Sequence, residues 1–210
     1  MPYKVVLLNG SPHTHGCTAR ALEEVAKTLR NEGIETELIQ IGKDAVHGCI
    51  SCGYCSTHDG CVFNTDKVNE VAAKFETADG LVIGSPVYYA SPNGTAISFM
   101  NRLFYSTGFS KQMKVGASVV SCRRGGNTSA FDVLNKYFTI SGMPVVSSTY
   151  WNQVHGFSAE DVEKDLEGLQ TMRNLGRNMA FLIRAIAAEK EKSSLPEAEH
   201  SAFTSFPDGK

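Results

Sequence analysis

The stretch Asn-Gly-Ser-Pro-His-Thr-His-Gly-Cys-Thr, residues 9–18, lies between an apolar run and an amphipathic segment. The run before it, residues 5–8, is short and aliphatic, which is typical of a strand buried on both faces. The segment after it places Leu22, Val25 and Leu29 at helical spacing. A strand, a polar turn and a helix in this order bring the unpaired N–H groups of a helix N-terminus to one point, where an anion binds favourably. The stretch therefore predicts a phosphate-binding loop.

The glycine spacing in this loop narrows the class of phosphate ligand. A nucleoside-triphosphate loop has four residues between its glycines and then Lys, whereas here five residues separate the two glycines and Cys17 follows. A dinucleotide loop needs a second glycine two residues after the first and an acidic residue at the end of the second strand, and both are missing. The hydroxyl side chains of Ser11, Thr14 and Thr18 suit one terminal phosphate monoester. An ordinary strand-to-helix turn is the alternative interpretation, because small polar residues are common in such turns.

Strand-like and helix-like segments alternate along the rest of the chain. Strands are predicted at residues 5–8, 34–41, 81–84, 115–120 and 144–149. Helices are predicted after the first loop and at residues 68–75, 97–103, 130–140 and 162–186, with Ser158 and Asp161 as a capping box before the last. This alternation predicts an α/β fold with a parallel sheet and helices on both of its faces.

Four cysteines form the sharpest local motif. Cys49, Cys52, Cys55 and Cys61 read C-x2-C-x2-C-x5-C, and three thiols within seven residues is spacing typical of ferredoxins. Zinc sites more often use two separated pairs of ligands. An iron-sulfur cluster, a zinc ion and free thiols are the three interpretations. Cys122, outside the motif, is interpreted as a buried residue at a strand end.

Composition excludes several classes of partner. The chain has 210 residues and a formal net charge of −2, so one α/β domain is expected, and no large basic field attracts nucleic acid or an anionic membrane. The apolar run at the N-terminus is too short for a signal peptide, and no long apolar segment follows. We therefore expect a cytoplasmic protein whose cysteines are thiols or ligands rather than disulfides.

Three features together resemble the flavodoxin-like NAD(P)H-dependent FMN reductase family, specifically its iron-sulfur-flavoprotein-like branch. They are the loop at residues 9–18, the stretch Gly-Ser-Pro-Val-Tyr-Tyr-Ala-Ser-Pro-Asn-Gly at 84–94, and the cysteine motif between them. The resemblance covers roughly residues 1–190. It implies a three-layer sandwich around a five-stranded parallel sheet of order 2-1-3-4-5. That order places the charged second strand at an edge and brings the loops after strands one, three and four together.

The resemblance also divides the chain and assigns its loops. It implies a flavodoxin-like FMN-binding domain at residues 1–192, with a cysteine-rich insertion at 42–65, and a tail at 193–210 that includes Pro196, Phe203 and Phe206. The implied FMN-binding residues are Ser11, Thr14, Gly16, Cys17 and Thr18 in the first loop, Pro86, Val87, Tyr88, Tyr89 and Asn93 in the second, and Ser121, Arg123, Arg124, Gly125 and Gly126 in the third. The family usually has Asn at the position of Cys17, so that residue is expected to contact the phosphate through its N–H.

Each loop has a physical reason to bind a flavin. A flavin ring needs a flat flank and N–H groups at its polar edge, and two adjacent tyrosines between prolines suit this need. Donors in the third loop would stabilise the negative charge that arrives on the ring during reduction. Arg123 and Arg124 either meet a phosphate of a nicotinamide nucleotide or form surface ion pairs. His155 is a further candidate, on the loop past the fifth strand, although a lone histidine is more often structural.

Three functions follow as hypotheses. The first is an FMN-dependent oxidoreductase that takes hydride from NAD(P)H and reduces a small acceptor such as a quinone, a nitro or azo compound, or free flavin. No catalytic acid or base is assigned, because the cofactor performs the chemistry. The second is an electron carrier fed by ferredoxin, with a [4Fe-4S] cluster on the four cysteines. The third is a flavodoxin-like binding module without turnover. The family and the apolar residues of the tail favour a homodimer or homotetramer.

Overall fold

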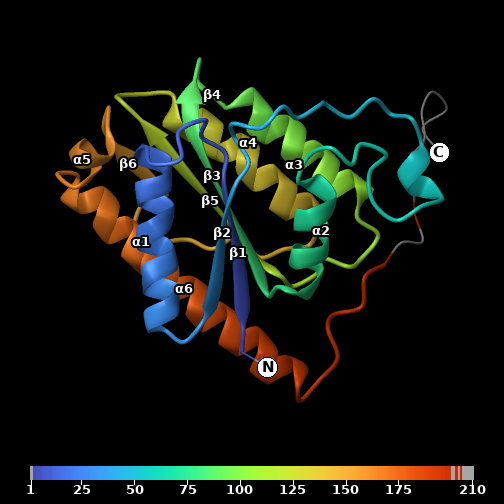
Figure 1. The fold of residues 1–210 in the computed structure, drawn as a ribbon. Helices are drawn as coiled ribbons and strands as arrows, with labels where there is room; N and C mark the ends of the chain where they lie inside the picture. The colour runs from blue at the N-terminus through green and yellow to red at the C-terminus, as the bar shows by residue number, and fades with distance from the viewer. Residues whose placement is uncertain (1, 200–201, 203, 205–210) are drawn as a thin grey trace.

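The computed structural model describes residues 2–199, 202 and 204, in which a twisted sheet lies between two layers of helices (Figure 1). The strands are β1 (Lys4–Asn9), β2 (Glu35–Gln40), β3 (Gly80–Tyr88), β4 (Ser91–Pro92), β5 (Val115–Cys122) and β6 (Gln153–His155). The helices are α1 (Cys17–Asn31), the 3-10 turn η1 (Tyr54–Ser56), α2 (Val68–Thr77), α3 (Gly94–Ser106), α4 (Asn127–Ile140), α5 (Ala159–Val162) and α6 (Leu166–Lys190).

The sheet has the order β2-β1-β3-β5-β6, and every pair along this path is parallel. The order 2-1-3-4-5 predicted for the parallel strands is confirmed, with β5 and β6 as the fourth and fifth. The sixth strand, β4, lies off the path and pairs antiparallel with the end of β3. It is the second arm of a short hairpin, which explains why the sheet has one strand more than predicted.

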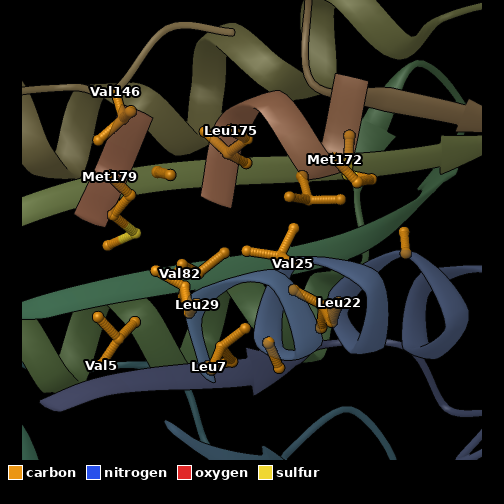
Figure 2. Close-up of a cluster of buried hydrophobic side chains, with 14 of the residues drawn as sticks. Val5, Leu7, Leu22, Val25, Leu29, Val82, Val146, Met172, Leu175 and Met179 are labelled. Carbon is orange, nitrogen blue, oxygen red and sulfur yellow. The ribbon is translucent and has the colours of Figure 1, made fainter. Parts of the chain in front are cut away.

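Side chains of β1 alternate between two cores, as a strand with both faces buried requires. Val5 and Leu7 pack with α1 and α6, while Val6 and Leu8 pack in the second core with α2, α3 and α4. Figure 2 shows the first core, in which labelled side chains of α1 and α6 meet over the strands. Asn9 ends β1 at the carboxyl edge of the sheet, so the loop that follows is held by a strand that is buried from Val5 to Asn9.

The strand predicted at residues 144–149 is wrong in position. Only Val145 forms a bridge, to Gly116, and the chain then leaves the sheet. The hydroxyl of Ser148 bonds to the Tyr150 carbonyl at 2.6 Å and to the Asn152 side chain at 2.7 Å. Such local side-chain bonds compete with strand pairing and bend the chain away. It returns at β6, which supplies the fifth parallel strand instead.

The last predicted helix is two helices. Ser158 and Asp161 form the predicted capping box, but it belongs to the single turn α5. Asp165 then caps the long helix α6 by accepting from the Gly168 N–H at 2.9 Å. The apolar pattern continues through the break because Val162 packs into the same core as α6.

The cysteine-rich segment and the tail are irregular. Residues 42–65, cyan in Figure 1, hold only the turn η1 as helix or strand within the described structure, and they extend beyond α3 before α2 begins. The side chain of Gln112 donates to the Pro196 carbonyl at 2.7 Å, which ties the start of the tail to the domain. Phe203 and Phe206 lie outside the described residues. Among the helices of the described chain, none combines the length and apolar character needed to cross a bilayer.

Candidate functional site

A cleft of about 900 Å³ opens at the carboxyl edge of the sheet. It lies where the loops after β1, β3 and β5 meet the segment after β6, which is the edge where open α/β sheets bind ligands. Its lining residues are Ser11, Pro12, His13, Thr14, His15, Gly16, Cys17, Thr18, Lys43, Pro86, Val87, Tyr88, Ser121, Cys122, Arg123, Gly156, Phe157, Ser158, Ala159 and Glu160.

Polar side chains of the protein itself hold the first loop in shape. The Ser11 N–H donates to Asn9 Oδ1 at 3.1 Å, and the Asn9 amide donates to Gln40 Oε1 at 2.6 Å. Gln40 in turn donates through Nε2 to the Ser11 carbonyl at 2.5 Å. The loop between β1 and α1 is therefore tied to β2 by hydrogen bonds of the protein itself.

Gly10 lets this loop approach the centre of the sheet. Its N–H donates to the Gly84 carbonyl at 2.8 Å, and a Cβ on Gly10 would lie 2.7 Å from both that oxygen and Ala96 Cβ. Asn93, a predicted FMN contact, serves the same junction rather than lining the cleft. Its side chain donates to the Gly10 carbonyl at 2.7 Å and accepts from the Thr95 N–H at the start of α3.

The N-terminus of α1 has no cap of its own. Among the described residues, no side chain caps Gly16 and no acid lies in the first turn, whereas α3 and α6 are capped by Asn93 and Asp165. Gly16, Cys17 and Thr18 line the cleft, so the N–H groups of this first turn are available to an anion there. Two hydroxyl side chains line the cleft beside these N–H groups, those of Thr18 and Ser121, and their oxygens lie 2.8 Å apart.

The charge around the cleft favours an anionic ligand. Lys43 and Arg123 contribute cationic side chains, and Glu160 is the one acid among the described lining residues. Burial raises the pKa of the Cys17 thiol, and the carboxylates of Asp161 and Glu160 raise it further. The thiol therefore stays neutral near pH 7, and no thiolate competes with an anion at the start of α1.

The second and third loops pack against each other beside the cleft. Tyr89 and Ala90 form the tip of the β3–β4 hairpin with φ of 50° and 59°, and Tyr89 is fully exposed. Gly126, with φ of 85°, faces this tip, since a Cβ there would lie 2.9 Å from Ala90 Cα. The left-handed backbone and the close approach both require glycine at position 126. Gly126 thus shapes the loop rather than lining the cleft.

The structure brings most of the predicted FMN contacts to one place. Ser11, Thr14, Gly16, Cys17, Thr18, Pro86, Val87, Tyr88, Ser121 and Arg123 line the cleft. Tyr89, Asn93, Arg124, Gly125 and Gly126 are absent from the described lining, and contact with FMN stays a prediction for all fifteen. His155 does not line the cleft either. Its N–H donates to Asp165 Oδ2 at 2.7 Å, while Gly156–Glu160 next to it form one wall.

The four cysteines line a second, smaller pocket with Arg102. Cys49 and Cys52 are exposed, and Cys55 and Cys61 are partly buried. No three metal-ligating side chains of the described chain are placed to hold a single metal ion. The four thiols line the same hollow. Four thiols around one hollow are the kind of donor set that a [4Fe-4S] cluster uses.

The fold and the cleft define a flavodoxin-like α/β protein with a site for a phosphorylated ligand. The chain belongs to the NADPH-dependent FMN reductase family, a family of flavoprotein oxidoreductases, whose model matches residues 3–157. An iron-sulfur flavoprotein of Methanocaldococcus jannaschii is 32% identical over 191 residues, which cover 87% of this chain and 98% of the relative. The resemblance to the iron-sulfur-flavoprotein-like branch is thereby confirmed.

Solved structures are similar in fold. The structure of RosB with bound 8-demethyl-8-formylriboflavin-5'-phosphate has a TM-score of 0.67 at 16% identity, covering 98% of this chain and 93% of that one. A flavodoxin from the domain Archaea has a TM-score of 0.59 at 15% identity, covering 86% of this chain and 99% of that one. Identities this low establish the flavodoxin-like fold alone, which agrees with the predicted fold class.

Proposed function

We propose that the protein is an FMN-dependent oxidoreductase that takes hydride from NAD(P)H and reduces a small acceptor such as a quinone, a nitro or azo compound, or free flavin. The observation that carries the proposal is the uncapped N-terminus of α1, which opens into the cleft between hydroxyl side chains. A terminal phosphate monoester satisfies N–H groups and hydroxyls of this kind. Membership of the FMN reductase family supports the same ligand.

The chain's own residues bind and orient the cofactor in this proposal. The first turn of α1 and the hydroxyls of Ser11 and Thr18 hold the phosphate, and Lys43 offsets part of its charge. Tyr88 offers a flat flank to the ring, and the loop after β5 offers N–H donors to its polar edge. FMN, when bound, supplies the hydride and one-electron chemistry. No side-chain acid or base is required.

Anaerobic mixing tests this function. The full chain is loaded with FMN, freed of excess cofactor and mixed with NADPH or NADH while flavin absorbance is followed. We expect either nucleotide to bleach the flavin within seconds, and an added quinone to restore its absorbance. Dithionite serves as the control for a reducible flavin. A flavin that dithionite reduces and neither nucleotide reduces would contradict the proposal.

A second candidate function is electron transfer through an iron-sulfur cluster fed by ferredoxin. Two observations favour it, namely the four cysteines around one pocket and the high coverage of a relative named as an iron-sulfur flavoprotein. Cys49, Cys52, Cys55 and Cys61 would hold a [4Fe-4S] cluster, which supplies one-electron chemistry when bound. Protein purified without oxygen should then be brown and contain iron and sulfide. Protein that stays colourless after anaerobic reconstitution with iron and sulfide would remove this candidate.

The proposed setting is a cytoplasmic homodimer or homotetramer. Exposed aromatic side chains support self-association, among them Tyr150 and Trp151, whose rings pack edge to face at 4.7 Å with about half of each residue exposed. Sedimentation of the full chain at micromolar concentration tests the proposal. A monomer at every concentration would contradict it.

A further inference from the structure

Arg102 is a buried arginine that lies beside the cysteine motif rather than at the cleft. It belongs to α3, its side chain has no exposed surface, and it pairs with Asp66, whose side chain is only 3% exposed. A second guanidinium nitrogen lies 3.3 Å from the other oxygen of the same carboxylate. Removing two charges from water costs free energy, so a buried ion pair often adds little to the stability of the folded protein. The other contacts of the guanidinium therefore indicate what this buried arginine does.

The guanidinium bonds to the chain on both sides of the cysteine motif. It donates to the His47 carbonyl at 3.4 Å, just before the first cysteine, and to the Phe63 carbonyl at 3.0 Å, just after the last. It also lies over the Phe63 ring, 5.0 Å from its centre, and that ring stacks on His47. One side chain from α3 thus closes the loop that carries the four thiols.

The remaining donor points at a thiol. Arg102 Nε lies 3.1 Å from Cys61 Sγ with hydrogen-bond geometry. An arginine at such a position is always charged, so it supplies a fixed positive charge and a fixed donor to that sulfur. Hydrogen bonds to cluster sulfurs and nearby charge set the reduction potentials of iron-sulfur centres.

We infer that Arg102 is a positioning residue of the cysteine motif, which holds the Cys61 thiolate for a cluster and raises the reduction potential of that cluster. The inference rests on the second candidate function. On reduction the cluster gains one electron, and no bond to Arg102 is made or broken. The Nε–H donor and the guanidinium charge favour the more negative, reduced form. Loss of both should make the cluster harder to reduce and easier to lose.

Three variants of the full chain, purified anaerobically and reconstituted with iron and sulfide, test this inference. Arg102→Lys keeps the charge beside Asp66 but loses the planar donor to Cys61. The double variant Arg102→Gln with Asp66→Asn removes both charges of the pair, so no buried carboxylate is left unpaired. Arg184→Gln is the matched control, since Arg184 is an exposed arginine paired with Glu32. Far-UV circular dichroism reports the fold, redox titration followed by electron paramagnetic resonance reports the potential, and transfer to a chelator reports the rate of iron loss.

We expect the potential to shift to more negative values in Arg102→Lys and in the double variant. Iron loss should be about tenfold faster or more, the usual scale for removing a group that orients a metal ligand. Arg184→Gln should match the wild type. Folded variants that take up no iron also support the inference. Folded variants with an unchanged potential and an unchanged rate of iron loss overturn the inference. An Arg102→Lys variant that does not fold also overturns it, because Arg102 would then only support the core. A wild-type chain that takes up no iron refutes the electron-carrier function itself.

Discussion

At the start of α1, Cys17 is the first helical residue and follows Gly16, an N-cap residue that gives no side-chain hydrogen bond to the first N–H groups. Its thiol is held neutral by burial, which leaves the positive end of the helix dipole facing the cleft. The free N–H groups lower the stability of the helix end and create the binding capacity of the site. A negative charge placed at this residue tests that binding capacity directly.

The substitution Cys17→Asp should therefore weaken FMN binding. The carboxylate repels a phosphate and occupies its donors, so the Kd for FMN should rise about tenfold or more, which corresponds to about 1.4 kcal/mol. The helix dipole favours a negative charge at this residue, but burial and the carboxylates of Asp161 and Glu160 oppose it, so the free energy of unfolding without FMN should not rise. Urea unfolding and a flavin fluorescence titration measure the two quantities.

Cys17→Ser is the control for this substitution, because it stays neutral and similar in size. Its Kd should remain within a few-fold of the wild type. Equal FMN affinity in Cys17→Asp and Cys17→Ser would show that the phosphate does not bind at the start of α1.

Among the elements, the β3–β4 hairpin carries backbone strain next to the cleft. Tyr89 and Ala90 both have positive φ, as a two-residue turn of type I′ requires, but neither is one of the residues that tolerate this conformation well. The left-handed conformation costs an ordinary residue about 1 kcal/mol or more. Strain of this kind tends to gather at functional sites, and here it projects Tyr89 into solvent beside the proposed flavin position.

Relief of that strain should make a substitution by glycine stabilising, whereas glycine usually lowers the free energy of unfolding. Ala90→Gly should raise the free energy of unfolding by about 1 kcal/mol, because glycine adopts a positive φ without steric cost. Ala73→Gly, at an exposed position of α2, is the matched control and should lower it by about the same amount. Urea unfolding of both variants measures the difference. If the two substitutions destabilise alike, the hairpin is not strained.

The helices α1, α5 and α6 are joined by a buried carboxylate. Glu24 accepts from Arg173 at 2.8 Å and from Arg20 at 2.9 Å, and Arg20 also pairs with Glu163. Burial by itself would raise the pKa of Glu24, but the hydrogen bonds from Arg173 and Arg20 outweigh it and hold the pKa below its ordinary value. A carboxyl with a lowered pKa in the folded state adds stability above its unfolded pKa, and this is lost as the pH falls through the folded one.

Replacement of this carboxylate should flatten the acid side of the stability curve. Glu24→Gln should lower the free energy of unfolding at pH 7 by about 1–2 kcal/mol, toward the low end for charged hydrogen bonds because Arg173 is partly exposed. The gap to the wild type should begin to narrow as the pH falls below the ordinary glutamate pKa of about 4.3, and it should close as the pH falls through the lowered folded-state pKa of Glu24. Urea unfolding at several pH values measures both. Glu163→Gln, on the exposed side of the same network, should cost much less. A gap that is constant with pH would contradict this account.

These elements also show which parts of the fold and the cleft could be predicted from the sequence. The β1 strand, its loop and α1 were predicted because apolar spacing and turn chemistry are local properties. The strand β6 was missed because three residues are too few for a pattern. Lys43 and the wall at residues 156–160 reach the cleft from irregular segments, so only tertiary packing places them there. Asn93 is a typical turn residue whether it contacts a ligand or caps a helix. Its hydrogen bond to the Gly10 carbonyl joins two loops far apart in the sequence, so residue spacing could not predict it.

For the whole molecule, the cleft lies at the ends of β1, β3 and β5, the three strands at the centre of the sheet. A ligand there contacts loops that are far apart in sequence and binds only when the complete sheet is formed. FMN should therefore stabilise the molecule as a unit. The cysteine pocket shares none of the described lining residues with the cleft, so the two sites should contribute independently.

Thermal unfolding at increasing FMN concentration tests this coupling. At a free FMN concentration of about 100 times the Kd, a ligand that binds only the folded state adds about 2.7 kcal/mol to the free energy of unfolding, so the Tm should rise continuously with concentration. Riboflavin, which lacks the phosphate, should give a much smaller shift at equal concentration, because it leaves the first turn of α1 unsatisfied. Cys52→Ser alters only the cysteine pocket and should leave the FMN shift unchanged. Equal shifts with riboflavin and FMN would mean that the ring, and not the phosphate loop, provides the binding energy, and the loop after β1 would then lose its proposed role.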